Sequence, residues 1–179
     1  MPFVASFVLV FVLALWAPRS FAVESAESFS TYTFVIEYGN LKQRALRGDR
    51  RALFQLANMN YAPPDGSGIA QSYKHAFELY VQAAMRGHRT SQHNVGAMYL
   101  NGDHVVQNTV EAVAWFTLAA RNGDPAGSRR KKEFETYLTD VGKERAAKRA
   151  QYLFRTFTEM QRRRIFDAKR FGLEISPLQ

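Results

Sequence analysis

The chain has 179 residues, of which 46% are hydrophobic and 13% aromatic, and its formal net charge is +8. This composition excludes a disordered chain, because enough apolar side chains are present to build the core of one domain. The sequence contains no Cys, which excludes disulfide bonds, thiolate catalysis, Cys-ligated metal and lipid attachment through a lipobox.

The first 22 residues are predicted to be a secretory signal peptide. An uncharged apolar run covers residues 3–17, and Ser20 and Ala22 are small residues at the positions that favour cleavage after residue 22. The run is shorter than the roughly 20 residues that a membrane-spanning helix needs, although an uncleaved membrane anchor is the alternative. We therefore expect an exported, periplasmic or secreted protein, and a bacterial periplasmic one fits the lack of Cys.

Residues 23–47 are predicted to form an N-terminal capping helix, centred on residues 28–46. The stretch 31–36 is rich in β-branched and aromatic residues, so a strand there is the alternative.

Residues 48–124 are predicted to hold two copies of a helix-turn-helix unit. Moving residues 112–124 back by 36 positions aligns them with residues 76–88, including the doubled alanines and the following glycine. The first helices are expected at about residues 50–60 and 91–100, and the second at about 73–86 and 109–121, with apolar residues at helical spacing.

Helix termini are marked by local signals. Ser72 and Asn108 precede the second helices, where their side-chain oxygens can accept free backbone N–H groups. Gly87 and Gly123 follow these helices, at positions where a left-handed backbone costs glycine least. Asp124, followed by a proline, is predicted to be the N-cap of the next helix.

At these residues the chain resembles the Sel1-like repeat family, whose members are relatives of the tetratricopeptide repeats. The second copy matches the family pattern at Gly87, Val95, Gly96, Met98, Tyr99, Gly102, Val105, Ala112, Trp115, Ala119 and Ala120. The first copy is looser, with Ala57 in place of the glycine, Leu79 in place of the tryptophan and a longer loop. The resemblance covers about residues 45–154 and includes residues 125–154 as terminal capping helices. It implies an all-α fold, a short right-handed α-solenoid of helix-turn-helix repeats with a concave face.

The C-terminal third is basic. Residues 129–170 carry 14 Lys and Arg against 6 Asp and Glu, whereas the rest of the mature chain is nearly neutral. Residues 155–179 are predicted to form a basic amphipathic helix and tail. Its apolar residues occupy an arc of about 140° at helical spacing and are Phe154, Phe157, Met160, Ile165, Ala168 and Phe171. The opposite side carries the predicted basic surface, formed by Arg155, Arg162, Arg163, Lys169 and Arg170. Arg164 breaks this pattern, because it falls within the apolar arc.

Three interpretations of this helix compete. Its apolar stripe could cap the last repeat and leave the arginines solvated, or dock a partner protein or a second copy of the chain. The helix could also lie on an anionic membrane surface. Nucleic-acid binding is not expected, because an exported protein rarely meets nucleic acid and no recognition motif is present.

The sequence predicts no catalytic, cofactor or metal site. His88 and His93 are five residues apart, which places them roughly 140° apart on a helix and not on one face as a zinc pair requires. The acidic residues Glu78, Glu111 and Asp103 form no evident pair, and no Ser lies in a nucleophile-elbow context.

The predicted function is therefore a non-catalytic protein-interaction adaptor or scaffold in the bacterial cell envelope, as the family resemblance also implies. We expect the first helices of the repeats to line the concave face and to contact a protein partner through Arg51, Gln55, Asn58, His93 and Asn94. One alternative is an envelope enzyme or enzyme regulator acting on peptidoglycan or polysaccharide, and another is a membrane-surface protein. The sequence does not indicate the identity of the partner, the pathway or the oligomeric state.

Overall fold

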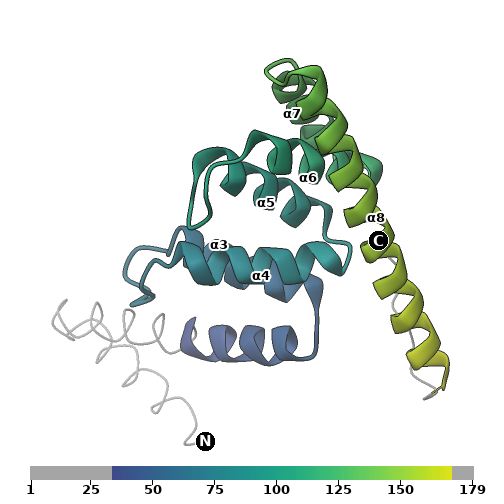
Figure 1. The fold of residues 1–179 in the computed structure, drawn as a ribbon. Helices are drawn as coiled ribbons and strands as arrows, with labels where there is room; N and C mark the ends of the chain where they lie inside the picture. Colours follow the sequence, from purple (N-terminus) through teal and green to yellow (C-terminus); the bar gives the residue numbers. More distant parts are fainter. Residues whose placement is uncertain (1–33, 171–179) are drawn as a thin grey trace, which may run out of the picture. The chain divides into compact units, whose positions relative to one another are not determined.

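A computed structural model gives the fold of the chain, and it describes residues 34–170 (Figure 1). The predicted signal peptide, the tail after residue 170 with Phe171, and the side chains of Ala168 and Lys169 lie outside the described residues. The chain divides into two compact units, residues 1–40 and residues 41–179. None of the described helices combines the length and the hydrophobicity needed to cross a membrane.

The second unit contains six labelled helices, and all regular secondary structure in residues 34–170 is helical. The helices are α3 (Arg50–Tyr61), α4 (Tyr73–Met85), α5 (Arg89–Asn101), α6 (Thr109–Arg121), α7 (Pro125–Glu135) and α8 (Asp140–Arg170). Each helix from α3 to α7 packs on the next along the chain, so the pairs α3–α4 and α5–α6 stack into a short α-solenoid (Figure 1). The predicted repeat helices are confirmed, with termini that differ from the expected ones by at most two residues.

Residues 34–46 form a further helix. Within the first unit, the rings of Phe34 and Tyr38 stack one turn apart, with centroids separated by 6.0 Å. The strand suggested for residues 31–36 is therefore wrong where the structure describes it. In the second unit, the carboxylate of Asp49 accepts hydrogen bonds from the guanidinium of Arg44 at 2.6 and 2.9 Å, at the turn before α3.

The predicted caps are confirmed. Ser72 and Asn108 accept hydrogen bonds from backbone N–H groups in the first turns of α4 and α6, and Asp124 does the same for α7 at 2.9 Å. Gly87 and Gly123 have φ angles of +85° and +81°. This left-handed backbone is sterically open to glycine and lets the chain reverse direction between one repeat and the next.

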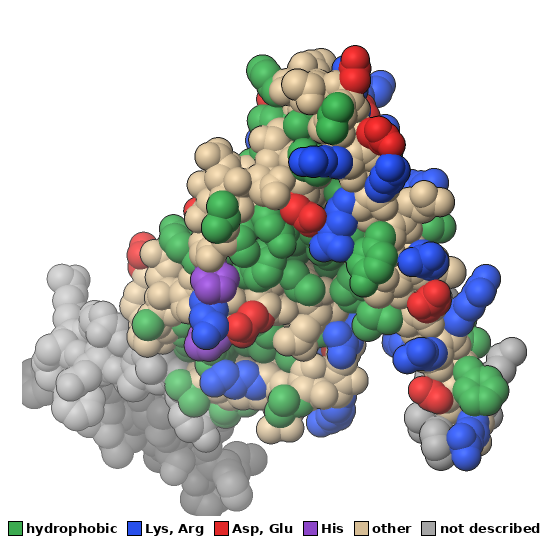
Figure 2. Space-filling model, in the orientation of Figure 1, with side chains coloured by type: hydrophobic (Ala, Val, Ile, Leu, Met, Phe, Trp, Pro, Cys, Tyr) green, Lys and Arg blue, Asp and Glu red, His purple; other side chains and the backbone are tan. Residues whose placement is uncertain are grey.

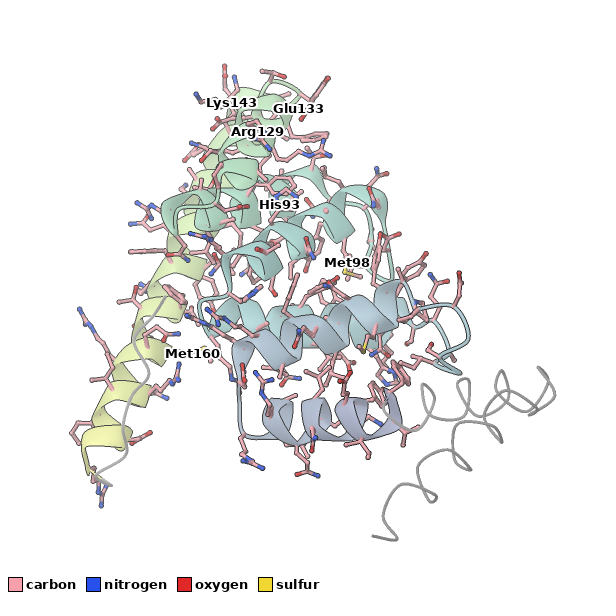
Figure 3. All side chains as sticks on the ribbon, turned by 180° about the vertical axis from the view of Figure 1, so that it is seen from behind. His93, Met98, Arg129, Glu133, Lys143 and Met160 are labelled. Atoms are coloured by element: carbon pink, nitrogen blue, oxygen red, sulfur yellow. The ribbon has the colours of Figure 1, made fainter. Side chains whose placement is uncertain are left out.

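The core depends on close contacts between large and small residues. Trp115 and Phe116 of α6 are almost completely buried, and Met98 of α5 lies in the same core, between the two helix pairs (Figure 3). A Cβ atom at Gly96 would lie 2.8 Å from the ring of Phe116, and one at Gly127 would lie 2.8 Å from the Cβ of Ala119. The glycines therefore let α5 and α7 approach α6 closely.

Helix α8 runs without interruption for 31 residues, so the predicted boundary between residues 154 and 155 is no break in the structure. The helix packs on α6, and an ion pair of 2.9 Å joins Arg149 to Glu111. Its buried line consists of Ala146, Ala150, Leu153 and Phe157. Of the described members of the predicted apolar stripe only Phe157 is buried, whereas Phe154, Met160 and Ile165 are exposed.

Candidate functional site

The predicted contact residues on α3 share one exposed face. Arg51, Gln55 and Asn58 are spaced at i, i+4 and i+7, which places them on the same side of the helix, and all three are exposed. Asn58 also has an internal role, since its Oδ1 accepts a hydrogen bond from the hydroxyl of Tyr80 at 2.6 Å. The exposed face of α3 that remains available to a partner is therefore centred on Arg51 and Gln55.

The two predicted contact residues on α5 are less accessible. The His93 side chain is only 20% exposed, its ring centroid lies 5.2 Å from that of Phe116, and its Nδ1 lies 3.5 Å from Oδ2 of Asp124 (Figure 3). Burial lowers the pKa of His93 more than the Asp124 carboxylate raises it, so the ring is neutral near pH 7. Asn94 is partly buried, and its side chain partly offsets the rise that burial causes in the pKa of Tyr80. The expectation that His93 is an exposed contact residue is wrong, because the ring of Phe116 and the carboxylate of Asp124 lie against it.

A polar pocket of about 460 Å³ lies where the ends of the repeats meet. The first turns of α3 and α5, the end of α6 and one residue of α8 contribute to its wall. The described lining residues are Arg50, Arg51, Gly87, His88, Arg89, Thr90, Asn122 and Phe157. We call this site the basic pocket.

The basic pocket has an excess of positive charge. Arg50, Arg51 and Arg89 line it, and no described lining residue is acidic. Burial lowers the pKa of Arg50 and of Arg86, and the positive charge of Arg164 lowers both further. The Nη1 atom of Arg50 also donates a hydrogen bond of 3.4 Å to the carbonyl oxygen of Arg86, which places the end of α4 beside the start of α3. Because an arginine stays protonated in proteins, five positive charges are concentrated in and around the pocket.

The sequence did not indicate Arg50, Arg89 or Asn122 as site residues, and it suggested His88 only as a metal ligand to be rejected. His88 is the N-cap of α5, and its Nδ1 accepts a hydrogen bond from the backbone N–H of Ser91 at 3.2 Å. The ring stacks on Phe54 with a centroid distance of 4.4 Å. Burial, followed by the charges of the nearby arginines, lowers the pKa of His88 to about 4, so the imidazole is neutral at pH 7.

The position of His88 in the repeat decides whether a negative charge lies in the wall of the basic pocket. At the equivalent turns before α3 and α7, the N-cap is an aspartate, Asp49 or Asp124. An aspartate before α5 would put a carboxylate into the wall of the basic pocket. His88 instead caps the helix with a neutral ring. Aligning the three Gly-Asp or Gly-His pairs of the sequence shows that His88 takes the place of an aspartate.

A buried hydrogen-bond chain holds one wall of the pocket in place. The side chain of Gln92 is fully buried, and its Nε2 donates to the carbonyl oxygen of Ala84 at 3.0 Å. Its Oε1 accepts from Nδ2 of Asn122 at 2.8 Å. These two bonds connect α4, α5 and the end of α6, so they fix Asn122 where it lines the pocket.

The basic side chains predicted for the C-terminal region lie along α8, where Figure 2 shows a series of Lys and Arg side chains. Arg155, Arg162, Arg163 and Arg170 are exposed. Arg164, which broke the sequence pattern, lies two turns after Phe157 on the same face, and its charge acts on the arginines at the basic pocket. On this face Gln161 donates a hydrogen bond of 3.0 Å to the carbonyl oxygen of Met85, at the end of α4.

The acidic residues considered for catalysis are not brought together. Glu111 pairs with Arg149, Asp103 accepts a hydrogen bond of 2.8 Å from the hydroxyl of Tyr61, and Glu78 is exposed. In the part of the chain that the structure describes, no group of three His, Cys, Asp or Glu side chains could hold a metal ion.

Comparison with known proteins identifies the repeats. Residues 50–88 and 90–124 match the family model described as Sel1 repeat, and these segments coincide with the pairs α3–α4 and α5–α6. No curated protein matches the chain.

Two solved structures have a similar fold. One is a protective antigen of uropathogenic Escherichia coli that displays an SLR fold, with a TM-score of 0.62 and 22% sequence identity over 78% of this chain and 29% of that chain. The other is a Sel1 repeat protein from Oxalobacter formigenes, with a TM-score of 0.50 and 26% identity over 68% of this chain and 88% of that chain. The chain thus spans less than a third of the length of the first structure, and that likeness establishes the fold alone.

Proposed function

The chain is a Sel1-like repeat protein, and from this premise we propose that it is a non-catalytic protein-binding adaptor or scaffold of the bacterial cell envelope. Solenoids of helix pairs generally present extended surfaces that bind other proteins. The observation that supports the proposal is the continuity of the exposed α3 face, around Arg51 and Gln55, with the basic pocket. Arg51 belongs to both, so a partner lying on α3 would also reach the pocket.

The proposed location in the envelope depends on residues 1–22, which lie outside the described residues. A signal peptide cleaved after Ala22 would release a mature protein that begins at Val23. The intact mass of the protein purified from a periplasmic fraction tests this location. A mass that corresponds to the chain from Val23 supports export, whereas an uncleaved protein in the membrane fraction would support the anchored alternative.

In-cell photo-crosslinking tests the adaptor function. A photoreactive amino acid in place of Gln55 is expected to crosslink a specific partner, and Arg51→Ala in the same chain should reduce that crosslink. Tyr137 is a suitable control position, because it is 73% exposed and lies between α7 and α8. The same crosslinked products from positions 55 and 137, or no effect of Arg51→Ala, would reject the α3 face as the binding surface.

A second candidate function is membrane-surface binding through the distal part of α8. Met160, Ile165 and Phe166 are exposed apolar residues that lie close in sequence to Arg162 and Arg163. Apolar and basic side chains together favour binding to anionic lipid surfaces. Cosedimentation with phosphatidylglycerol vesicles that is lost in the double variant Arg162→Glu/Arg163→Glu would support this function. Equal binding of that variant would reject it.

A further inference from the structure

We propose that the basic pocket binds an acidic peptide segment of the partner protein, an inference that rests on the proposed adaptor function. The segment would place at least two carboxylates among Arg50, Arg51 and Arg89, and an apolar side chain against Phe157. It would continue along the exposed face of α3 at Gln55. The inference thus assigns a chemical class to the partner and a recognition role to a defined group of residues.

Positive charge is concentrated at the basic pocket. Arg50, Arg51 and Arg89 come from the first turns of two different repeats, and Arg164 approaches from α8. Arg50 is partly buried, whereas Arg51 and Arg89 are exposed, and like charges gathered at one site repel one another unless an anion compensates them. No described ion pair joins Arg51, Arg89 or Arg164 to a carboxylate of the chain. A negatively charged ligand would therefore relieve this repulsion.

The helix cap that lines the pocket, His88, is neutral. Because Nδ1 of His88 accepts the Ser91 N–H, the ring proton is on Nε2, which can donate a hydrogen bond to an oxygen of a ligand. The aspartates at the two equivalent turns could not do so, since a carboxylate only accepts hydrogen bonds. Thus the N-cap that lines the pocket carries no negative charge, whereas neither Asp49 nor Asp124 is among the described lining residues.

The volume and the apolar wall of the pocket favour a peptide over a small anion. A pocket of about 460 Å³ is large for a single carboxylate or phosphate ion, and the ring of Phe157 forms part of its wall. An inorganic ion cannot use an apolar wall, whereas a peptide can place an aromatic or aliphatic side chain there. The planar guanidinium groups are suited to bidentate hydrogen bonds with carboxylates.

A binding measurement with defined probes tests the inference. The full chain is titrated into a fluorescein-labelled peptide Glu-Asp-Glu-Phe-Glu-Asp-Glu, and into its uncharged counterpart Gln-Asn-Gln-Phe-Gln-Asn-Gln, while the fluorescence anisotropy is recorded. We expect the acidic peptide to bind at least about tenfold more tightly at low salt and to weaken as the salt concentration rises.

Matched charge changes separate specific binding from general attraction to a basic protein. Arg51→Glu/Arg89→Glu should weaken binding of the acidic peptide by at least about tenfold, whereas Arg162→Glu/Arg163→Glu alters the net charge equally and should leave it nearly unchanged. His88→Asp should also weaken binding, and the variant should still fold because aspartate is a good N-cap, with a lower thermal midpoint because the ring stacking on Phe54 is lost. This variant keeps the inference testable even where an arginine pair affects folding.

Several outcomes would overturn the inference. These are equal losses in the two double variants, equal binding of both peptides, or complete competition by inorganic phosphate at the same concentration as the acidic peptide. Displacement of the peptide by phosphatidylglycerol vesicles that depends on Arg51 and Arg89 would instead assign the pocket to lipid headgroups and also overturn it. Failure of peptide binding with an intact Arg51-dependent crosslink at position 55 would reject this inference alone, whereas loss of that crosslink would reject the adaptor function.

Discussion

The hydroxyl of Tyr80 on α4 donates a hydrogen bond of 2.6 Å to the side-chain oxygen of Asn58 on α3. Tyr80 is almost fully buried, and burial raises its pKa to about 12, so the phenol stays protonated over the whole physiological range. The bond joins the two helices of the first repeat next to the proposed binding face. Asn58 thus contributes to the geometry of that face as well as to its exposed surface.

Removing this hydrogen bond should destabilise the first repeat. Tyr80→Phe is expected to lower the free energy of unfolding by about 1 kcal/mol, because the ring remains packed and one buried bond is lost. Asn58→Ala should have a similar effect, and the double variant should lose less than the sum, since both changes remove the same bond. Urea unfolding followed by circular dichroism measures the three values. If the loss in the double variant equals the sum of the two single losses, the hydrogen bond between Tyr80 and Asn58 contributes nothing to stability.

The contact between α6 and α7 should not tolerate a methyl group. Gly127→Ala is expected to lower the free energy of unfolding by about 1–3 kcal/mol, because its Cβ would lie 2.8 Å from the Cβ of Ala119 and 3.1 Å from the carbonyl oxygen of Phe116. Gly39→Ala is the matched control, since it lies in a helix with nothing within 4 Å of the added atom. The control should be neutral or stabilising by up to about 1 kcal/mol. A Gly127→Ala protein as stable as the natural chain would contradict the close approach.

His88 should make the stability of the protein depend on pH. Its pKa in the folded protein is about 4, below the ordinary value of 6.5, so between these two values the unfolded chain binds more protons. Stability from this group is therefore complete above about pH 6.5 and is lost as the pH falls towards 4. His88→Asn keeps a capping side chain without a titrating group and should reduce this slope.

Thermal midpoints at pH 7.5 and pH 5 of both proteins check this expectation. Part of the slope should persist in the variant, because burial lowers the pKa of His93 as well. An identical pH dependence in the two proteins would show that His88 is not the titrating group.

The buried amide of Gln92 should be more important for stability than its polarity suggests. Gln92→Leu is expected to lower the free energy of unfolding by about 2 kcal/mol, because the Nδ2 of Asn122 loses its acceptor and the carbonyl oxygen of Ala84 keeps only backbone donors such as the N–H of Gly87. Gln55→Leu is the control on an exposed helix face and should change stability by less than about 0.5 kcal/mol. The free energy of unfolding of both variants is measured by urea unfolding. An equal change in the two would mean that hydrogen bonds to water replace the buried ones.

The elements of the repeats could be predicted because their signals are local. Ser72, Asn108, Gly87, Gly123 and Asp124 mark helix termini through interactions with their own neighbouring backbone, and the structure places each in the expected role. The resemblance of residues 112–124 to residues 76–88 then indicates that the units stack.

What the sequence did not disclose depends on contacts between distant segments. The repeat pattern of the sequence places His93 on the first helix of the second repeat. That its ring is covered depends on the positions of Asp124 and Phe116, which the pattern does not give. The boundary expected at residue 154 was placed where the composition of the sequence changes. A change in composition does not end a helix as long as the backbone can continue its hydrogen bonds. After Gly142 the rest of α8 contains neither Gly nor Pro, so it continues to Arg170. The basic pocket combines α3, α5, α6 and α8, and no local pattern marks it.

The path of α8 has a consequence for how the protein unfolds. In a simple repeat array each unit contacts only its neighbours, so the terminal units can open while the others stay folded. Here α8 packs on α6, reaches Met85 at the end of α4, and shares one buried cluster with residues of α3, α4, α5 and α6. The last repeat therefore cannot detach without breaking contacts made by the first. We expect the amide hydrogens of α4 and α6 to exchange through one common opening, as in a single cooperative domain.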